Sequence, residues 1–155
     1  MTQLTFSPVD TPIGWVYIVT DGAAVVEITF EMPPYPQLYD GGRAASELQE
    51  YMIGKRFTFD VPIKPGRHSK FYAAVYKALR EIPYGATRSY KELAAAAASP
   101  NAARAVGQAM GRNPIPIILP CHRVIASDGS LGGYTGGVTI KEQLLALERR
   151  YAHDS

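Results

Sequence analysis

Ile117-Ile118-Leu119-Pro120-Cys121-His122-Arg123-Val124 is the stretch around which the chain is organised. It holds the single cysteine of the 155 residues, after an apolar run and before a polar, glycine-rich segment. A thiol, an imidazole and a guanidinium therefore follow one another at the end of a segment that we expect to be buried. Neighbouring cations stabilise the thiolate, the nucleophilic form of cysteine. The alternative is a small buried hydrophobic residue beside two solvated side chains, because free cysteine is often buried.

Length and composition indicate one domain, or two small domains that share an interface. Hydrophobic residues make up 46% of the chain and charged residues 19%, as in ordinary globular proteins. No apolar run approaches the roughly 20 residues of a membrane span, and we recognise no signal peptide. A single cysteine excludes an internal disulfide and a cysteine-based zinc site, and a free thiol suits a reducing compartment. We therefore expect a cytoplasmic protein without membrane contact.

Charge is distributed unevenly between the two halves of the chain. Residues 1–68 carry 5 Lys and Arg against 8 Asp and Glu, whereas residues 69–155 carry 11 against 6. The basic half is also the half with the cysteine. A basic surface suits a polyanionic partner such as DNA, although many globular domains with no nucleic-acid role have a similar balance.

The N-terminal part predicts a small antiparallel sheet. Strand patterns cover residues 4–6, 15–20 and 23–30, and Asp21-Gly22 between the last two is a strong hairpin signal. A loop rich in proline and glycine precedes a predicted helix over residues 43–53. Three further features complete this part: a C-cap at Gly54, one more strand at residues 57–59, and a link at residues 62–66.

Helix-capping signals divide the following segment. Ser69 opens a helix that ends near Ile82, and Ser89 with Glu92 three residues later has the spacing of a capping box. Ser99-Pro100 then begins another helix, which runs to about Met110. Two short helices with a tight connection predict a helix-turn-helix, and an ordinary helical hairpin is the alternative.

The second of these helices has an unusual surface, because Arg104 is its only charge among small residues. Small side chains let a helix backbone approach a neighbouring helix, or the wall of a DNA groove, closely. After the cysteine, the glycine-rich residues 132–137 predict a loop that could wrap a flat ligand. A phosphate-binding loop is the weaker alternative, because no Gly-Lys-Ser/Thr ending follows. Residues 139–142 have a second capping-box pattern and begin a C-terminal amphipathic helix.

Pro120-Cys121-His122-Arg123-Val124 resembles the active-site motif of the O6-alkylguanine-DNA alkyltransferases. The match covers about residues 69–151, whereas the N-terminal part resembles the family only through residues 11–14. Similar family patterns occur at matching spacing at Ile82-Pro83-Tyr84-Gly85, Ser89-Tyr90, Ala102–Gly107, Asn113-Pro114, Gly133–Gly137 and Leu144–Glu148.

The resemblance implies an α+β protein. We expect residues 1–66 to form a structural domain with a small antiparallel sheet, ribonuclease-H-like, together with the linker. We expect residues 67–155 to form a mainly helical domain that binds DNA and carries the active-site cysteine. Its helix-turn-helix would enter the minor groove, as in the family, and not the major groove that most such motifs read.

Removal of an alkyl group from a guanine oxygen needs a soft nucleophile, a base and a group that orients the base. Cys121, His122 and Glu148 can fill these roles. A direct hydrogen bond between adjacent side chains is rare, so we expect a water molecule between Cys121 and His122. For Glu148 the alternative is a solvated helix charge. The resemblance adds Asn113, which would link the DNA-binding helix to the cysteine, and Tyr90, which would contact the base.

The resemblance also assigns binding residues. For the substrate they are Tyr90, Met110, Cys121, Val124, Tyr134, Thr135 and Lys141. For DNA they are Arg104, Ala103, Ala105, Gly107, Arg112 and Arg123. Arg104 would fill the gap left by a flipped nucleotide. Thr135 departs from family members that have serine there, which leaves the pocket width open, and a surface position is the alternative for Lys141.

The implied function is direct repair of double-stranded DNA that contains O6-alkylguanine. The protein would flip the damaged nucleotide out and transfer the alkyl group to Cys121 irreversibly, once per molecule. We expect a monomer with no cofactor and no metal, located in the cytoplasm of a prokaryote and at the nucleoid through DNA binding.

Three other functions compete with this interpretation. A non-catalytic alkyltransferase-like protein would lack the cysteine. A thiol hydrolase would need an oxyanion hole and would turn over. A transcriptional regulator of the adaptive-response type would carry an added cysteine-rich zinc domain, which this sequence lacks.

Overall fold

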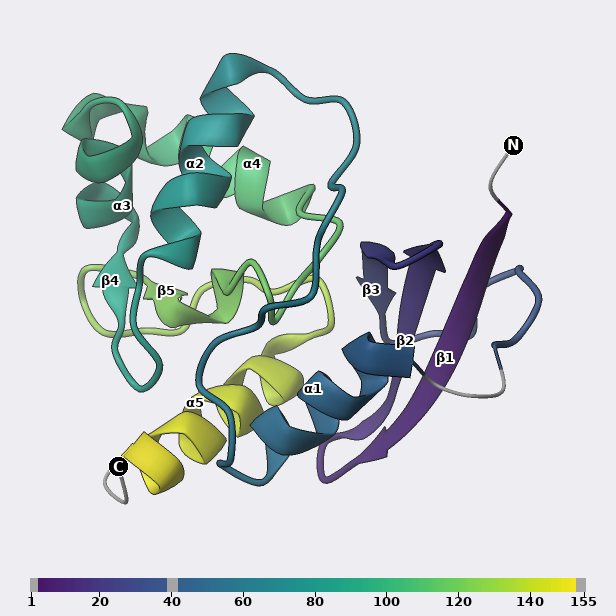
Figure 1. The fold of residues 1–155 in the computed structure, drawn as a ribbon. Coiled ribbons are helices and arrows are strands. Elements are labelled where there is room, and N and C mark those ends of the chain that lie inside the picture. The colour runs from purple at the N-terminus through teal and green to yellow at the C-terminus, as the bar shows by residue number, and fades with distance from the viewer. Residues whose placement is uncertain (1–2, 39–41, 153–155) are drawn as a thin grey trace.

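A computed structural model describes residues 3–38 and 42–152. Within these ranges the N-terminal part forms an antiparallel sheet in the order β1-β2-β3 (Figure 1). Its strands are β1 (Leu4–Thr11), β2 (Gly14–Asp21) and β3 (Ala24–Thr29). Gly22 has a φ of 62° in the β2–β3 turn, a conformation that glycine adopts without steric cost. The three predicted strands and their hairpin are confirmed.

Helix α1 (Gly42–Met52) covers this sheet and continues toward the C-terminal helix. It buries Leu48, Tyr51 and Met52. Gly54 ends it with a φ of 74°, and a Cβ atom there would lie 2.3 Å from the ring of Tyr151. The predicted C-cap therefore also permits the end of α1 to pack against the last helix.

The strand predicted at residues 57–59 is wrong. Residues 57–59 form no strand, and side chains hold this segment and the two residues that follow it. Oε1 of Glu47 accepts from the amides of Asp60 and Val61 at 2.9 and 3.0 Å, and Arg56 donates to the Thr58 carbonyl at 3.1 Å. The two phenylalanines of this segment pack on tyrosine rings.

Glu47 therefore holds the segment that follows α1 in place. This carboxylate is buried, with the residue only 2% exposed. Replacing it with alanine leaves the buried amide of Val61 without its acceptor, so we expect a loss of about 2–3 kcal/mol of stability. The melting temperature should fall by about 5–10 °C. Glu50→Ala, which removes an exposed partner of the same Arg56, should lower it far less. Equal effects would contradict this role for Glu47.

The C-terminal part is mainly helical, as predicted. Ser69 caps the first helix through the Tyr72 amide at 3.1 Å, and Ser89 and Glu92 form the expected capping box. The helix-turn-helix is present, with a 3-10 turn before its second helix. The elements in chain order are α2 (Lys70–Arg80), β4 (Arg88–Ser89), α3 (Tyr90–Ala97), η1 (Pro100–Ala102), α4 (Ala103–Gly111), η2 (Cys121–Arg123), β5 (Val124–Ile125) and α5 (Val138–Ala152).

One capping prediction is wrong in this part. Helix α5 already begins at Val138, and the amide of Lys141 donates to the carbonyl of Gly137. Thr139 thus lies inside the first turn and does not cap it.

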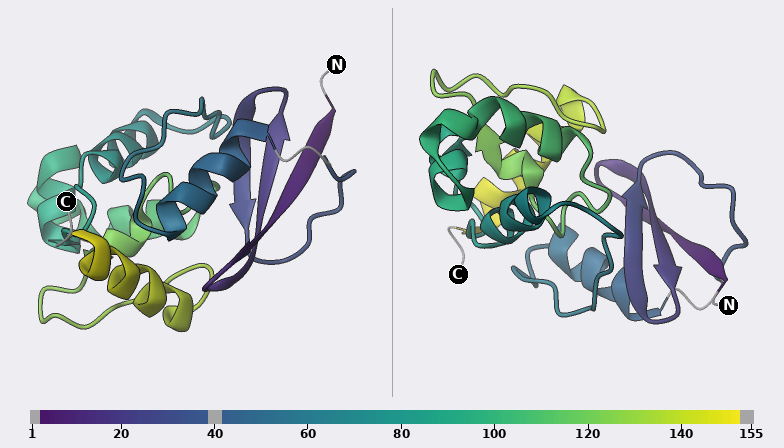
Figure 2. Two further views of the ribbon diagram at one scale, coloured as in Figure 1. Left: turned by 60° about the horizontal axis from the view of Figure 1, so that its bottom comes forward. Right: turned by 90° about the horizontal axis from the view of Figure 1, so that it is seen from above.

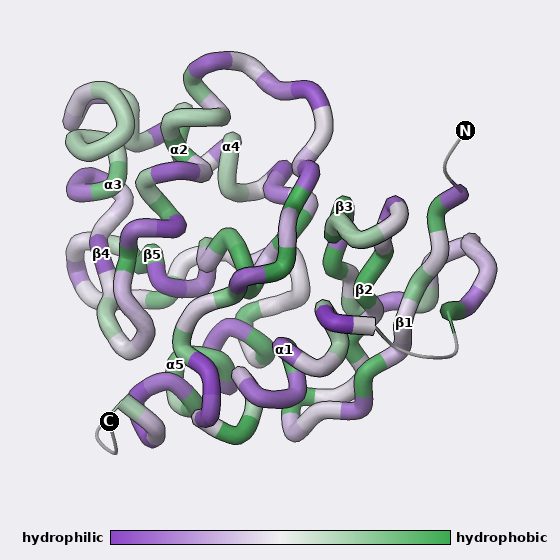
Figure 3. The backbone as a smooth tube through the Cα atoms, in the orientation of Figure 1, coloured by the Kyte–Doolittle hydropathy of each residue, from purple (hydrophilic) through white to green (hydrophobic). Residues whose placement is uncertain are grey.

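The sheet and the helices share one hydrophobic core. The left view of Figure 2 shows α1 and α5 side by side, with the sheet beyond α1, and the hydroxyl of Tyr51 on α1 donates to Glu148 on α5. The edge strand β3 meets the C-terminal part directly, because the Ile28 amide donates to the Pro114 carbonyl at 2.9 Å. Hydrophobic residues recur along β2 and β3 (Figure 3). The ribonuclease-H-like label and the boundary between residues 66 and 67 stay predictions.

Among the helices of residues 3–38 and 42–152, none is long and apolar enough to span a membrane.

Candidate active site

The segment before Cys121 is a buried loop held from within by Asn113. The Asn113 amide nitrogen donates to the Leu119 carbonyl at 2.8 Å, and its oxygen accepts from the Ile115 amide at 2.9 Å. Between them Ile117 has a φ of 77°, which is strained for a β-branched residue. The packed loop leads from the end of α4 at Gly111 to the 3-10 turn that begins with Cys121.

A short parallel ladder brings Tyr90 to the cysteine. Strand β4 pairs with β5, with Arg88 opposite Val124 and Ser89 opposite Ile125. The capping box at Ser89 then starts α3 with Tyr90 as its first residue. The residue that follows β4 and the turn that precedes β5 therefore lie at one place in the fold.

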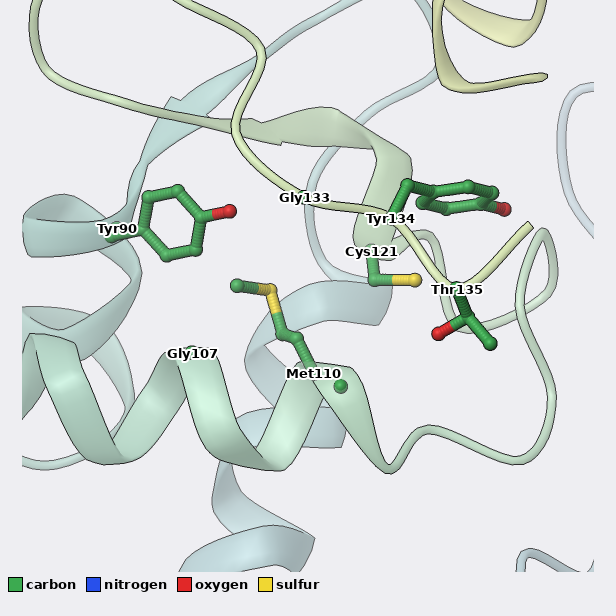
Figure 4. Close-up of a pocket in the computed structure, with 8 residues that line it drawn as sticks. Tyr90, Gly107, Met110, Cys121, Gly133, Tyr134 and Thr135 are labelled. Carbon is green, nitrogen blue, oxygen red and sulfur yellow. The ribbon is translucent and has the colours of Figure 1, made fainter. Parts of the chain in front are cut away.

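Tyr90 and Cys121 lie in the same pocket, which has a volume of about 420 Å³ (Figure 4). Ligand pockets in proteins commonly have about 300–1,000 Å³. The Tyr90 ring lies across the pocket from Tyr134, and the Cys121 side chain points toward Thr135. The residues that line it are Tyr90, Gly107, Met110, Gly111, Cys121, Gly133, Tyr134 and Thr135.

The glycine-rich loop closes against Tyr90. Gly132 has a φ of 72°, and a Cβ atom there would lie 2.6 Å from the Tyr90 hydroxyl oxygen. A larger residue would push the tyrosine away, so this glycine is required by the close approach. The loop forms one wall of the pocket, in agreement with the predicted wrap around a flat ligand.

Two predicted substrate contacts do not line this pocket. Val124 and Lys141 are both fully buried. The Lys141 ammonium donates to the carbonyls of Val124 at 2.7 Å, Gly133 at 3.3 Å and Leu131. An ammonium has three hydrogens, so none is left for a leaving oxygen. Lys141 fastens the pocket wall, which corrects both the substrate contact and the surface position considered for it.

His122 and Glu148 form a buried pair behind the cysteine. Nε2 of His122 lies 2.6 Å from Oε2 of Glu148, and both side chains are almost completely buried. A carboxylate only accepts, so the imidazole hydrogen lies on Nε2 and the lone pair on Nδ1. Nδ1 is buried and has no hydrogen-bond partner among the described residues. It is therefore the atom that can accept a proton from the thiol.

The predicted DNA contact of Arg123 is wrong. Arg123 is buried, and its Nε and Nη2 lie 2.8 and 2.9 Å from the two oxygens of Glu148. Its Nη1 donates to the Ile82 carbonyl at 2.7 Å. A guanidinium used in this way cannot reach a phosphate. Arg123 fixes the carboxylate that orients His122.

Burial sets the protonation states at rest. It raises the pKa of Cys121 to about 11, while Asn113 and Lys141 act in the opposite direction. Burial also lowers the pKa of His122, against the effect of Glu148. Burial alone would raise the pKa of Glu148, but its hydrogen bonds with His122 and Arg123 lower the pKa overall. The cations beside Cys121 therefore do not produce a resting thiolate, and a neutral imidazole stands behind a neutral thiol, as the predicted need for a base requires.

Helix α4 runs from an exposed surface to the pocket. Arg104 and Ala105 are exposed, Ala103 is half-buried, and Arg112 is exposed at the end of the helix. Gly107 lies one turn beyond Arg104 and lines the pocket together with Met110. A small-residue surface with two arginines thus adjoins the cysteine pocket. Direct contact of these residues with DNA stays a prediction.

Residues 70–150 match the family described as 6-O-methylguanine DNA methyltransferase, DNA binding domain. The methylated-DNA–protein-cysteine methyltransferase of Mycolicibacterium paratuberculosis is 42% identical over 160 residues, which cover 97% of this chain and 95% of that protein. The chain belongs to the methylated-DNA–protein-cysteine methyltransferase family. Another member of the family, from Methanosarcina barkeri, is 55% identical over 105 residues, covering 68% of this chain and 66% of the relative.

The structural similarity extends over both parts of the fold. The crystal structure of Mycobacterium tuberculosis OGT in complex with DNA has a TM-score of 0.85 and 39% sequence identity, covering 95% of this chain and 94% of that one. The family and the two-part α+β architecture predicted from the sequence are confirmed. The roles of the individual site residues stay predictions.

Sequence reasoning missed two contributors to this site. Gly111 lines the pocket, and Tyr51 from α1 donates to Glu148. Gly111 follows the predicted substrate contact Met110, so its position in the sequence could have indicated it. Tyr51 is separated from Glu148 by 97 residues, and no local pattern connects the two.

Proposed function

We propose that this protein repairs O6-alkylguanine in double-stranded DNA by transferring the alkyl group to Cys121. The observation that carries the proposal is a thiol in a pocket beside helix α4, with a buried His122–Glu148 pair behind it. Relatives of high coverage are methylated-DNA–protein-cysteine methyltransferases, and a similar solved structure is a complex with DNA. We further propose a monomer that acts in the cytoplasm at the nucleoid.

The resting protonation states define the chemical step. His122 takes the proton of Cys121 on Nδ1, through one water molecule. The sulfur then attacks the alkyl carbon and forms a carbon–sulfur bond as the carbon–oxygen bond breaks. The electron pair of the broken bond goes to the guanine, which takes up one proton from water, while His122 releases the proton that it took from Cys121 to water. Glu148 holds the imidazole and stabilises its charged form.

The pocket walls would hold the base. Tyr90 points its hydroxyl into the pocket, Tyr134 offers a flat face, and Thr135 lies close to where the Cys121 side chain points. The target atom cannot be reached inside a duplex, so the nucleotide must leave the base stack, at a cost of a few kcal/mol. Arg104 is exposed one turn from the pocket and could occupy the gap.

Stoichiometry separates this function from a thiol hydrolase. The product is a thioether, and none of the groups that line the pocket can cleave it. The protein should accept one methyl group and then stop, even with excess substrate. The experiment mixes it with a tenfold excess of duplex DNA that contains O6-methylguanine and counts restored guanines. Continued turnover would contradict the proposal.

The burial of the site predicts the pH dependence of the transfer. A neutral imidazole is needed, and the pKa of His122 lies below its ordinary value of about 6.5. The rate should therefore be constant through neutral pH, fall only in acid as His122 is protonated, and rise in alkali toward about pH 11 as the thiol ionises. Rates of benzyl transfer from free O6-benzylguanine test this. Half-maximal rate near pH 8.5, the ordinary thiol pKa, would contradict it.

A further inference from the structure

Glu148 receives a hydrogen bond from the N-terminal half of the chain. The Tyr51 hydroxyl donates to Oε2 at 2.5 Å, and the same oxygen faces His122 at 2.6 Å. Arg123 donates to both oxygens, and the Gly85 amide donates to Oε1 at 3.1 Å. The tyrosine is the one donor to this carboxylate, among the described residues, that comes from outside the C-terminal part.

The Tyr51 ring is held so firmly that its hydroxyl has little freedom. The residue is fully buried at the end of α1. The Phe59 ring lies 5.5 Å away, and the Tyr84 ring packs edge-on at 5.6 Å. Since the end of α1 also packs on α5, both partners of the hydrogen bond are anchored in the same core.

We propose that Tyr51 is a positioning residue for alkyl transfer, which fixes the Glu148 carboxylate and moderates its pull on His122. The inference rests on the proposed function of Cys121 as the alkyl acceptor. Under this inference a residue of the N-terminal part helps to position the reacting groups, whereas the sequence indicates only a structural role for that part.

The physical reason is competition for one oxygen. Tyr51, His122 and Arg123 all donate to Oε2, so each donor withdraws part of its negative charge. Without the phenol, more charge acts on the imidazole, which favours its protonated form and raises the pKa of His122. The carboxylate also loses a fixed contact and orients the base less well. The other titratable or charged groups around the pair are Cys121, Arg123, Lys141 and Tyr84.

Tyr84 supplies a matched control. Its ring packs on Tyr51, and its hydroxyl is buried near the same carboxylate. That hydroxyl has no hydrogen-bond partner in residues 3–38 and 42–152. Tyr51→Phe and Tyr84→Phe therefore remove the same atom from the same aromatic cluster, but only the first removes a hydrogen bond to Glu148.

The experiment measures benzyl transfer from free O6-benzylguanine by intact mass, from mildly acidic to mildly alkaline pH. Tyr51→Phe should lower the rate at saturating substrate by about tenfold, which corresponds to about 1.4 kcal/mol, with little change in the half-saturating concentration. The acid limb of the profile should move to higher pH. Tyr84→Phe should match the wild type. Fluorotyrosine introduced only at position 51 donates a stronger hydrogen bond to Glu148 than tyrosine does, so it should move the acid limb to lower pH.

Two results would overturn the inference alone. In one, wild type reacts and Tyr51→Phe behaves like Tyr84→Phe. In the other, Tyr51→Phe reacts more slowly, but the acid limb of the pH profile does not move in this variant or in the fluorotyrosine protein. That outcome would indicate a purely structural role for Tyr51. A wild-type protein that forms no benzylated Cys121 would overturn the proposed function, and this inference with it.

Discussion

Replacing Cys121 with serine should abolish methyl transfer to the protein while binding to duplex DNA stays nearly unchanged. Serine keeps the approximate size of the side chain but replaces the soft sulfur with a hydroxyl oxygen, which is a much weaker nucleophile toward an alkyl carbon. The surface of α4 that we propose to bind DNA should be unaffected, since Cys121 is buried and lies outside that helix.

Radiolabelled O6-methylguanine in a duplex tests this prediction directly. Wild type should carry the label through denaturing electrophoresis, whereas Cys121→Ser and Cys121→Ala should carry none and still retard the DNA in a native gel. Label on either variant would mean that another residue accepts the methyl group. Loss of DNA binding in both variants would mean that the thiol serves the fold.

Replacing Arg104 with alanine should slow repair in duplex DNA by about 10- to 100-fold and leave the reaction with free O6-benzylguanine almost unchanged. Extrusion of a nucleotide costs a few kcal/mol, and each 1.4 kcal/mol corresponds to a factor of ten. A free base needs no extrusion. The two substrates therefore separate a role in flipping from a role in the chemistry.

Arg112→Ala is the matched control, because it removes another exposed arginine, at the C-cap of α4. We expect it to weaken binding and to lower the salt dependence by about one counterion, as for a single phosphate contact. Its repair rate at saturating DNA should stay near that of the wild type. Equal losses for Arg104→Ala on duplex and free base would contradict the flipping role.

Local signals predicted most of the fold. The hairpin at Asp21-Gly22, the caps at Ser69 and Ser89 and the glycine at position 54 each depend on a few neighbouring residues. The strand predicted at residues 57–59 failed for the opposite reason. Its alternating phenylalanines resemble a strand, but their rings pack on tyrosines and Glu47 on α1 binds the amides of the next two residues, Asp60 and Val61.

In the candidate site, too, local motifs were predictable and contacts between distant residues were not. The motif around Cys121 predicted the nucleophile and the base, and the family resemblance added Glu148; the structure places His122 and Glu148 2.6 Å apart. The charges of Arg123 and Lys141 suggested contacts with DNA or substrate. Their real partners are a carboxylate 25 residues away and carbonyls of the pocket wall. Such pairings arise only after the chain has folded, so neither spacing nor composition could reveal them.

Intact mass spectrometry with peptide mapping, after reaction with duplex DNA containing O6-methylguanine, tests the central claim most directly. The account predicts a gain of one methyl group per protein, located on the peptide that contains Cys121, together with an equal amount of restored guanine. An unmodified protein beside repaired DNA, or a methyl group on any other residue, would contradict it.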